Sequence, residues 1–101
     1  MLKTIITSDI FDKWLDDLRD RQAKAVIEIH IRRMGLGNIG KVKNVGNNVF
    51  EKKIYYGAGY RLYFVNRNDS LIFILCAGDK STQSKDIKLA LVLVKEVNKH
   101  G

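Results

Sequence analysis

The chain has 101 residues and a formal net charge of +7, which allows one small domain and excludes a multidomain enzyme. Its single cysteine, Cys76, excludes an intrachain disulfide and a cysteine-based zinc site. The apolar runs are too short for a membrane helix, and the N-terminal segment does not resemble a cleavable signal. The composition therefore predicts a soluble, cytoplasmic domain over residues 1–101 that makes no membrane contact.

The positive charge is concentrated in one segment. Residues 32–61 carry a net charge of +6, from one acid, Glu51, and seven basic side chains: Arg32, Arg33, Lys41, Lys43, Lys52, Lys53 and Arg61. A local excess of this kind in a small domain is typical of proteins that bind phosphate groups. A solvated lysine-rich surface that only improves solubility is the alternative interpretation.

The N-terminal third predicts a strand followed by two helices. Residues 2–6 are expected to form the strand, and Ser8 or Thr7 to cap the first helix. Asp20 is expected to cap the second helix, which glycines 35 and 37 should end. In both helices the apolar residues recur at the spacing of one helical face, so the two should form a hairpin with a common apolar side.

From Gly40 onward the apolar period changes to two, which predicts strands at 41–45, 49–56, 60–66 and 71–77. The short turns between them favour an antiparallel meander with one face covered by the helical hairpin. The last strand is apolar throughout, which indicates a central position in the sheet. Ser81 or Thr82 is expected to cap a final helix reaching about residue 98. The predicted fold class is α+β: short N-terminal strand, two-helix hairpin, four-stranded antiparallel meander and C-terminal helix.

Strand alternation predicts which side chains face away from the hairpin. The core-facing residues should be Phe50, Ile54, Leu62 and Phe64. The residues between them should lie on an open face of the sheet, namely Glu51, Lys53, Arg61 and Tyr63. Lys43 can join this face, and Lys80 should follow the last strand in a loop. Solvated charges on an antiparallel sheet are the alternative interpretation.

Other kinds of site are poorly supported by the sequence. No carboxylate cluster or pair of histidines has the spacing of metal ligands, so neither a metal nor a cofactor is predicted. Cys76 lies in an apolar strand with no histidine near it in sequence, which argues against a nucleophile. The glycines between 35 and 40 fit a dinucleotide spacing, but they follow a helix instead of a strand.

A set of local runs spans nearly the whole chain in a fixed order. The runs are Phe11-Asp12-Lys13-Trp14-Leu15, Leu18-Arg19-Asp20, Gly37-Asn38, Gly40-Lys41-Val42-Lys43, Val49-Phe50-Glu51, Lys53-Ile54, Tyr56-Gly57-Ala58-Gly59-Tyr60-Arg61-Leu62-Tyr63, Gly78-Asp79-Lys80-Ser81-Thr82-Gln83, Asp86-Ile87 and Ala90. In these runs the chain resembles the RelE/ParE superfamily of toxin–antitoxin systems, within it the HigB-like addiction module killer proteins. The Gly-Tyr-Arg and Gly-Asp-Lys-Ser-Thr-Gln runs are the most specific.

The resemblance implies a RelE-like fold and a ribosome-dependent mRNA endoribonuclease. Such a toxin inhibits translation until a cognate antitoxin, of the helix-turn-helix, HigA-like kind, binds it. The implied chemistry is metal-free: the ribose 2′-hydroxyl attacks the adjacent phosphorus and expels the 5′-oxygen. This reaction needs a proton acceptor, a proton donor and positive charge at the phosphorane.

The resemblance also suggests the site residues. Catalytic candidates are Arg61, Lys53, Lys80 and Glu51, and RNA-binding candidates are Lys43, Lys41, Lys52, Tyr63 and Gln83. Arg61 matches the family's arginine after Gly-Tyr and is the leading candidate for phosphate stabilisation. Glu51 is either a general base or an ion-pair partner of Lys43 or Lys53.

One departure from the family pattern keeps other functions open. Many members carry a histidine or tyrosine near the C-terminus, and residues 88–97 contain neither. The alternatives are a ParE-like inhibitor of DNA gyrase that cuts nothing, and a basic nucleic-acid-binding module.

The final helix is apolar nearly all round, with Leu89, Val92 and Leu93 beside its main stripe. It is therefore expected either to be deeply buried or to meet an antitoxin segment or a second copy.

Overall fold

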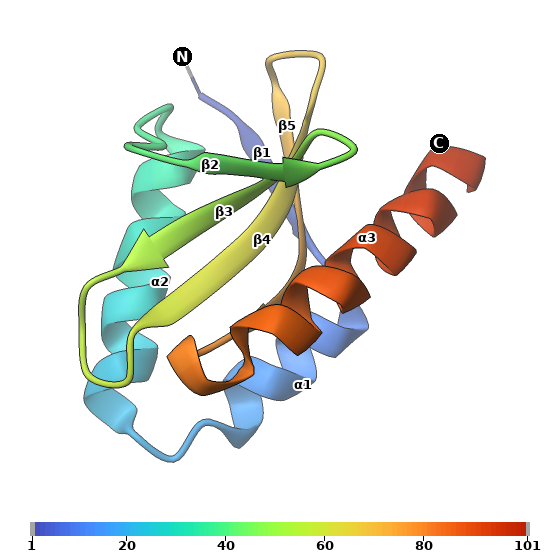
Figure 1. Cartoon of the computed structure of the whole chain (residues 1–101). Helices are drawn as coiled ribbons and strands as arrows, with labels where there is room; N and C mark the ends of the chain where they lie inside the picture. Colours follow the sequence, from blue (N-terminus) through green and yellow to red (C-terminus); the bar gives the residue numbers. More distant parts are fainter. Residues whose placement is uncertain (1, 101) are drawn as a thin grey trace.

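The computed structural model describes residues 2–100, which form a five-stranded sheet with helices on both faces (Figure 1). The elements are β1 (Thr4–Thr7), α1 (Asp9–Asp17), α2 (Arg21–Gly35), β2 (Lys43–Gly46), β3 (Val49–Ile54), β4 (Tyr60–Arg67), β5 (Leu71–Gly78), the 3₁₀ helix η1 (Lys80–Thr82) and α3 (Gln83–His100). The predicted α+β class and its order of elements are confirmed.

The strands lie in the order β1-β5-β4-β3-β2. β2 to β5 form the predicted antiparallel meander. β1 adds to its far edge parallel to β5, with Ile5 opposite Ile72. The apolar strand β5 is therefore an inner strand, as its composition indicates, although the middle position belongs to β4.

The helices begin where local side chains satisfy their free backbone N–H groups. Ser8 Oγ accepts from the N–H of Phe11 at 3.0 Å, and Asp20 Oδ1 accepts from the N–H of Ala23 at 3.0 Å. The expected cap of the final helix at Ser81 or Thr82 is wrong. Asp79 caps η1 instead, accepting from the N–H of Ser81 at 2.8 Å, because the chain makes one 3₁₀ turn before α3.

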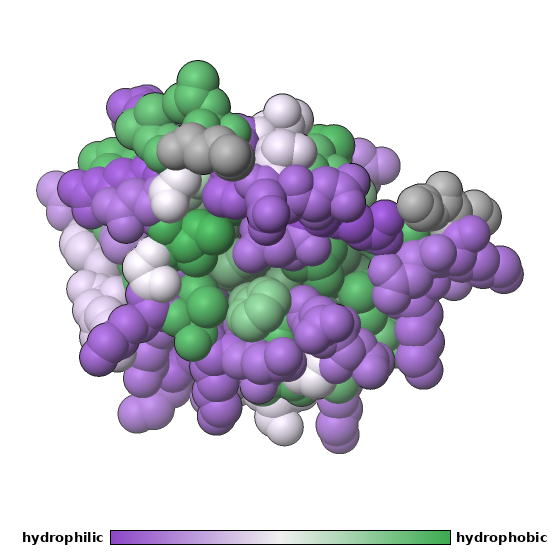
Figure 2. Space-filling model, turned by 90° about the horizontal axis from the view of Figure 1, so that it is seen from above, coloured by the Kyte–Doolittle hydropathy of each residue, from purple (hydrophilic) through white to green (hydrophobic). Residues whose placement is uncertain are grey.

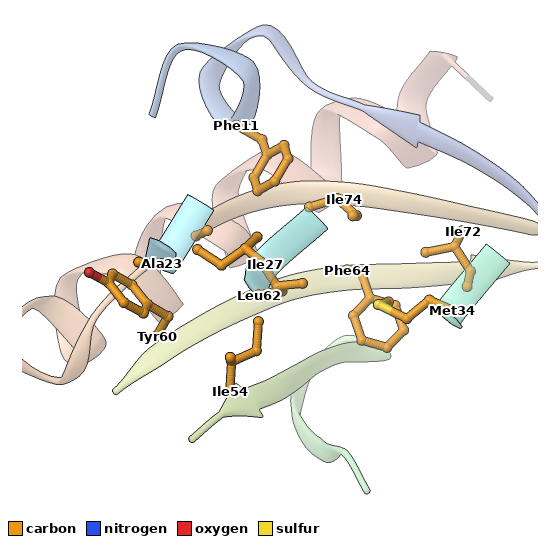
Figure 3. Close-up of a cluster of buried hydrophobic side chains, with 11 residues drawn as sticks. Phe11, Ala23, Ile27, Met34, Ile54, Tyr60, Leu62, Phe64, Ile72 and Ile74 are labelled. Carbon is orange, nitrogen blue, oxygen red and sulfur yellow. The ribbon is translucent and has the colours of Figure 1, made fainter. Parts of the chain in front are cut away.

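Two apolar clusters flank the sheet. The first lies under α1 and α2 and is called the α2-side cluster (Figure 3): Phe11, Ala23, Ile27, Met34, Ile54, Tyr60, Leu62, Phe64, Ile72, Ile74 and Ala77. The second lies under α3 and is called the α3-side cluster: Val49, Tyr63, Val65, Leu75, Cys76, Ala90 and Val94. The predicted core-facing positions of β3 and β4 are confirmed. The expectation of an open second face is wrong, because α3 lies across β5, β4 and β3.

Hydrophilic and apolar side chains are mixed on the face seen from above, as Figure 2 shows. The large apolar side chains that stay exposed come from different elements: Leu2, Ile6, Ile10, Ile29, Leu36, Val42, Tyr55 and Val92. Within residues 2–100, no helix is both long enough and apolar enough to cross a membrane.

Candidate functional site

A cleft of about 300 Å³ beside β2 and β3 brings together side chains from separate parts of the chain. We call it the basic cleft; it is lined by Lys41, Val42, Lys43, Glu51, Lys53, Tyr55 and Gln83. Strand pairing sets Lys43 opposite Glu51, and alternation along β3 places Lys53 on the same side of the sheet. Gln83 reaches it from the first residue of α3. The structure thus unites five residues that the sequence analysis selected.

Glu51 is the acid of this cleft, and its carboxylate is held by neutral donors. The side chain is only 7% exposed. Its Oε2 atom accepts from the Tyr63 hydroxyl at 3.0 Å and from Gln83 Nε2 at 3.0 Å. Among the described residues it forms no ion pair with Lys43 or Lys53, so the ion-pair alternative is not what the structure shows.

Tyr63 does not lie on an open face, and its predicted role in RNA binding is wrong. Its ring is fully buried in the α3-side cluster, where no nucleobase can stack on it. Burial raises the pKa of Tyr63, and the hydrogen bond to Glu51 and the charge of Glu51 raise it further. The hydroxyl therefore stays protonated at neutral pH and remains a donor to Glu51.

Tyr55 is the aromatic side chain that the basic cleft presents to solvent. It is 87% exposed, and Lys53 Nζ lies 5.3 Å from the centroid of its ring. A cation at this distance contacts the ring face favourably. The strand alternation places Tyr55 on the side of Lys53, but its exposure depends on where β3 ends, which the sequence did not indicate.

Arg61 is buried, contrary to the expectation of an exposed strand residue. The side chain is 3% exposed, and Nη1 donates to the Gly59 carbonyl at 2.7 Å. Its Nε atom is buried without a hydrogen-bond partner. The strand register places it opposite Lys53 on β3 and Gly78 on β5. Arg61 is therefore a cation held in place beside Lys53, and its Nε–H group is free to donate. Among the described residues, no carboxylate forms an ion pair with it.

Two further candidates lie apart from the cleft. Lys52 lies on the opposite side of the sheet, where its Nζ donates to the Ile39 carbonyl at 2.7 Å. Burial lowers the pKa of Lys52, and the charge of Arg33 lowers it further. Lys52 therefore lies on the other side of the sheet from Lys53, and its predicted role in RNA binding stays a prediction. Lys80 is exposed on η1 instead of a loop, with its Cβ close to Gly59.

The sequence analysis missed the role of Asp86. Its carboxylate is 8% exposed and accepts from Thr82 Oγ1 at 2.5 Å. It also lies against Gly78, where an added Cβ would come within 1.7 Å of Asp86 Oδ2. The four-residue spacing from Thr82 to Asp86, just after Gly78, is the signal that was available. These contacts fix the start of α3 and thereby the position of Gln83.

A larger cleft, of about 530 Å³, lies between α1 and α2 and contains none of the candidates. Its lining includes three acids, Asp12, Asp16 and Glu28, against two bases, Lys24 and Arg32. Because acids outnumber bases in its lining, this cleft does not suit a negatively charged phosphate polymer. Within residues 2–99, no group of three or more histidine, cysteine, aspartate or glutamate side chains could hold a metal ion.

Comparison with known proteins gives one informative match. No protein-family model matches the chain. A protein of Haemophilus influenzae, described as an uncharacterized protein, is 47% identical over 96 residues, which cover 95% of this chain and 94% of the relative. The chain belongs to the family of this Haemophilus protein. The match runs nearly end to end in both proteins. The relative's description names no activity, and the function is therefore argued from the site.

Proposed function

We propose that the chain is the toxin of a type II toxin–antitoxin module, in the HigB-like branch of the RelE/ParE superfamily. In this proposal it is a metal-free endoribonuclease that cuts ribosome-bound mRNA in the cytoplasm. The observation that carries the proposal is the basic cleft, which sets Glu51 among Lys41, Lys43 and Lys53. The Nε atom of Arg61, which has no hydrogen-bond partner, belongs to a residue directly opposite Lys53 and so on the same side of the sheet. A phosphate polymer complements this arrangement of charges.

The residues divide the reaction between them as follows. Glu51 takes the proton from a ribose 2′-hydroxyl, whose oxygen forms a bond to the adjacent phosphorus while the bond to the 5′-oxygen breaks. The products are a 2′,3′-cyclic phosphate and a 5′-hydroxyl. The leaving oxygen takes its proton from water or from Lys80, which is outside the cleft lining but, like Arg61, lies close to Gly59. Lys53 and Arg61 stabilise the negative charge that develops on the phosphorus oxygens.

The remaining cleft residues bind the RNA on either side of the cut. Lys41 and Lys43 are exposed and suit the phosphate backbone. The exposed ring of Tyr55 offers a face on which an unstacked base can lie. Gln83 contacts Glu51, which leaves it a smaller part in RNA binding than the sequence analysis expected.

The proposed antitoxin is a helix-turn-helix, HigA-like protein whose acidic segment covers the basic cleft. On α3, Leu89 and Leu93 are packed against the α3-side cluster, while Val92 is 57% exposed. The helix therefore offers a partner less apolar surface than its sequence alone indicates. Neutralisation through the cleft would weaken as salt is added, because exposed charges are screened.

A second candidate function is inhibition of DNA gyrase without cleavage, as in ParE-like toxins. It is favoured by the lack of histidine or tyrosine in residues 88–97, where many cleaving relatives in the superfamily carry a general acid. Binding of nucleic acid without any reaction is the least specific alternative. Both alternatives use the same basic surface but leave RNA intact.

The test is to induce the protein in cells and map new RNA ends, comparing Lys53→Ala with the matched control Lys13→Ala. Lys53 is an exposed cation of the cleft, whereas Lys13 is an exposed cation on α1, paired with Asp17. We expect new ends inside translated messages, and cleavage reduced about tenfold or more by Lys53→Ala, since one transition-state cation is lost. Lys13→Ala should stay within about twofold of wild type.

Three results would contradict the proposal. A DNA-damage response without new RNA ends would favour gyrase inhibition. Equal cleavage by Lys53→Ala and Lys13→Ala would move the site away from the basic cleft. Loss of cleavage when the protein is treated with a chelator, freed of it and added to ribosomes in magnesium buffer, with recovery on adding zinc or manganese, would contradict the metal-free mechanism.

A further inference from the structure

The hydrogen bonds at Glu51 are unevenly distributed between its two oxygens. Tyr63, from β4, and Gln83, from α3, both donate to Oε2, each at 3.0 Å. The other oxygen, Oε1, has no hydrogen-bond partner among residues 2–100 and is not among the buried polar atoms without partners. One oxygen is therefore anchored, and the other is left for the cleft that Glu51 lines.

Both hydrogen bonds run in one direction only, with Glu51 as the acceptor. A carboxylate only accepts hydrogen bonds, so the amide nitrogen of Gln83 has to face it. The Tyr63 hydroxyl is fully buried and stays protonated, so it donates over the whole physiological pH range. Both donors are uncharged, so they orient the carboxylate without cancelling its charge as a lysine or arginine would.

We propose that Tyr63 and Gln83 are positioning residues that clamp Oε2 of Glu51 and direct Oε1 at the 2′-hydroxyl of the RNA. This inference rests on the proposed endoribonuclease function and assigns its proton-accepting atom. Neither side chain touches the reacting atoms; each acts through Glu51. In the reaction the 2′-hydroxyl proton moves to Oε1, the O2′–P bond forms, and the P–O5′ bond breaks.

The clamp also connects the base to the placement of α3. Gln83 is the first residue of α3, and the start of this helix is fixed by the contacts of Asp86 with Thr82 and Gly78. Tyr63 is held from the other side by the α3-side cluster. Glu51 is therefore directed only when α3 is docked on the sheet.

The experiment compares kcat and KM for cleavage of ribosome-bound mRNA by wild type, Tyr63→Phe and Gln83→Ala, with Tyr56→Phe as the matched control. Tyr56→Phe also removes one tyrosine hydroxyl, but that hydroxyl donates to Gln22 Oε1 on α2 at 3.0 Å. We expect each clamp variant to lower kcat about tenfold with little change in KM. Tyr56→Phe should change neither.

A measurement without RNA tests the clamp independently. Labelled tyrosine followed by NMR should show that Glu51→Gln moves the ring resonances of Tyr63, since the Tyr63 hydroxyl donates to Glu51 Oε2 at 3.0 Å. Unchanged Tyr63 resonances would overturn the inference. If wild type cleaves ribosome-bound mRNA but neither clamp variant lowers kcat, the inference fails and the proposed function survives. If folded wild type cleaves no ribosome-bound mRNA, both fail.

Discussion

A single methyl group added at Gly78 should disrupt the docking of α3. Gly78 ends β5, and the Asp86 and Thr82 side chains lie directly against its Cα. The Cβ of Gly78→Ala would come within 1.7 Å of Asp86 Oδ2 and 2.6 Å of Thr82 Oγ1. Neither group can remain in place, because both distances are far inside normal contact.

Two costs add up in this variant. Forcing a methyl group into a packed site costs about 1–3 kcal/mol. Moving Asp86 also strains or breaks its hydrogen bond with Thr82, and a hydrogen bond to a charged group is worth about 1.5–3 kcal/mol. A loss of about 4 kcal/mol in the free energy of unfolding is therefore expected. For a domain of this size it corresponds to a fall in Tm of about 15–30 °C.

The assay is urea and thermal denaturation followed by circular dichroism, with Gly35→Ala as the matched control. The Cβ at position 35 would meet Ile5 Cγ1 at 3.4 Å, which is ordinary contact. Gly35 is the last residue of α2, and alanine there should leave stability unchanged or raise it by up to about 1 kcal/mol. If Gly78→Ala unfolds within about 1 kcal/mol of wild type, the packing of Asp86 against β5 is refuted.

Two further predictions concern groups buried near β5. Burial raises the pKa of Asp86, so the native state binds the Asp86 proton more tightly than the unfolded chain does. The protonated carboxyl therefore stabilises the fold at low pH, and this stabilisation is lost as the pH rises through the raised pKa. Urea denaturation at about pH 4 and about pH 7 should therefore show the free energy of unfolding of Asp86→Asn rising relative to that of wild type at the higher pH, and a fall relative to wild type would contradict the reasoning. Burial raises the pKa of Cys76 to about 12, and the charge of Asp86 contributes to this rise. Because the thiolate is the reactive form, the folded protein should react with a thiol reagent far more slowly than the denatured protein at about pH 8. Equal rates would place the thiol at the surface.

The order of elements could be predicted because local signals fix it. Ser8 and Asp20 begin helices because the side chain of each accepts a hydrogen bond from the backbone N–H three residues later. Left-handed backbone at Asn47 and Asn48 closes the β2–β3 turn where the sequence has Gly-Asn-Asn. The partner of β1 had no such signal, since it pairs with a strand 67 positions later, at Thr4 and Leu71.

The candidate site was predictable only in part. Alternation alone places Glu51 and Lys53 on one side of β3, and register adds Lys43. The burial of Arg61 and Tyr63 depends on where α3 crosses the sheet, and no spacing within β4 encodes that. Lys52 belongs to the charged segment by sequence, but its position in the alternation assigns it to the other face.

The parallel pairing of β1 with β5 has a consequence for the nascent chain. Thr4–Thr7 is synthesised long before its partner, Leu71–Ile74, and Ser8 Oγ donates to the Leu75 carbonyl. Contacts between residues so far apart in sequence close late and slow the folding of the domain. Gln83, which completes the contacts of Glu51, follows β5 in the chain. The N-terminal edge of the sheet and the basic cleft therefore assemble in the same late stage, when more than four-fifths of the chain has been made. No earlier fragment contains both the framework and the complete cleft.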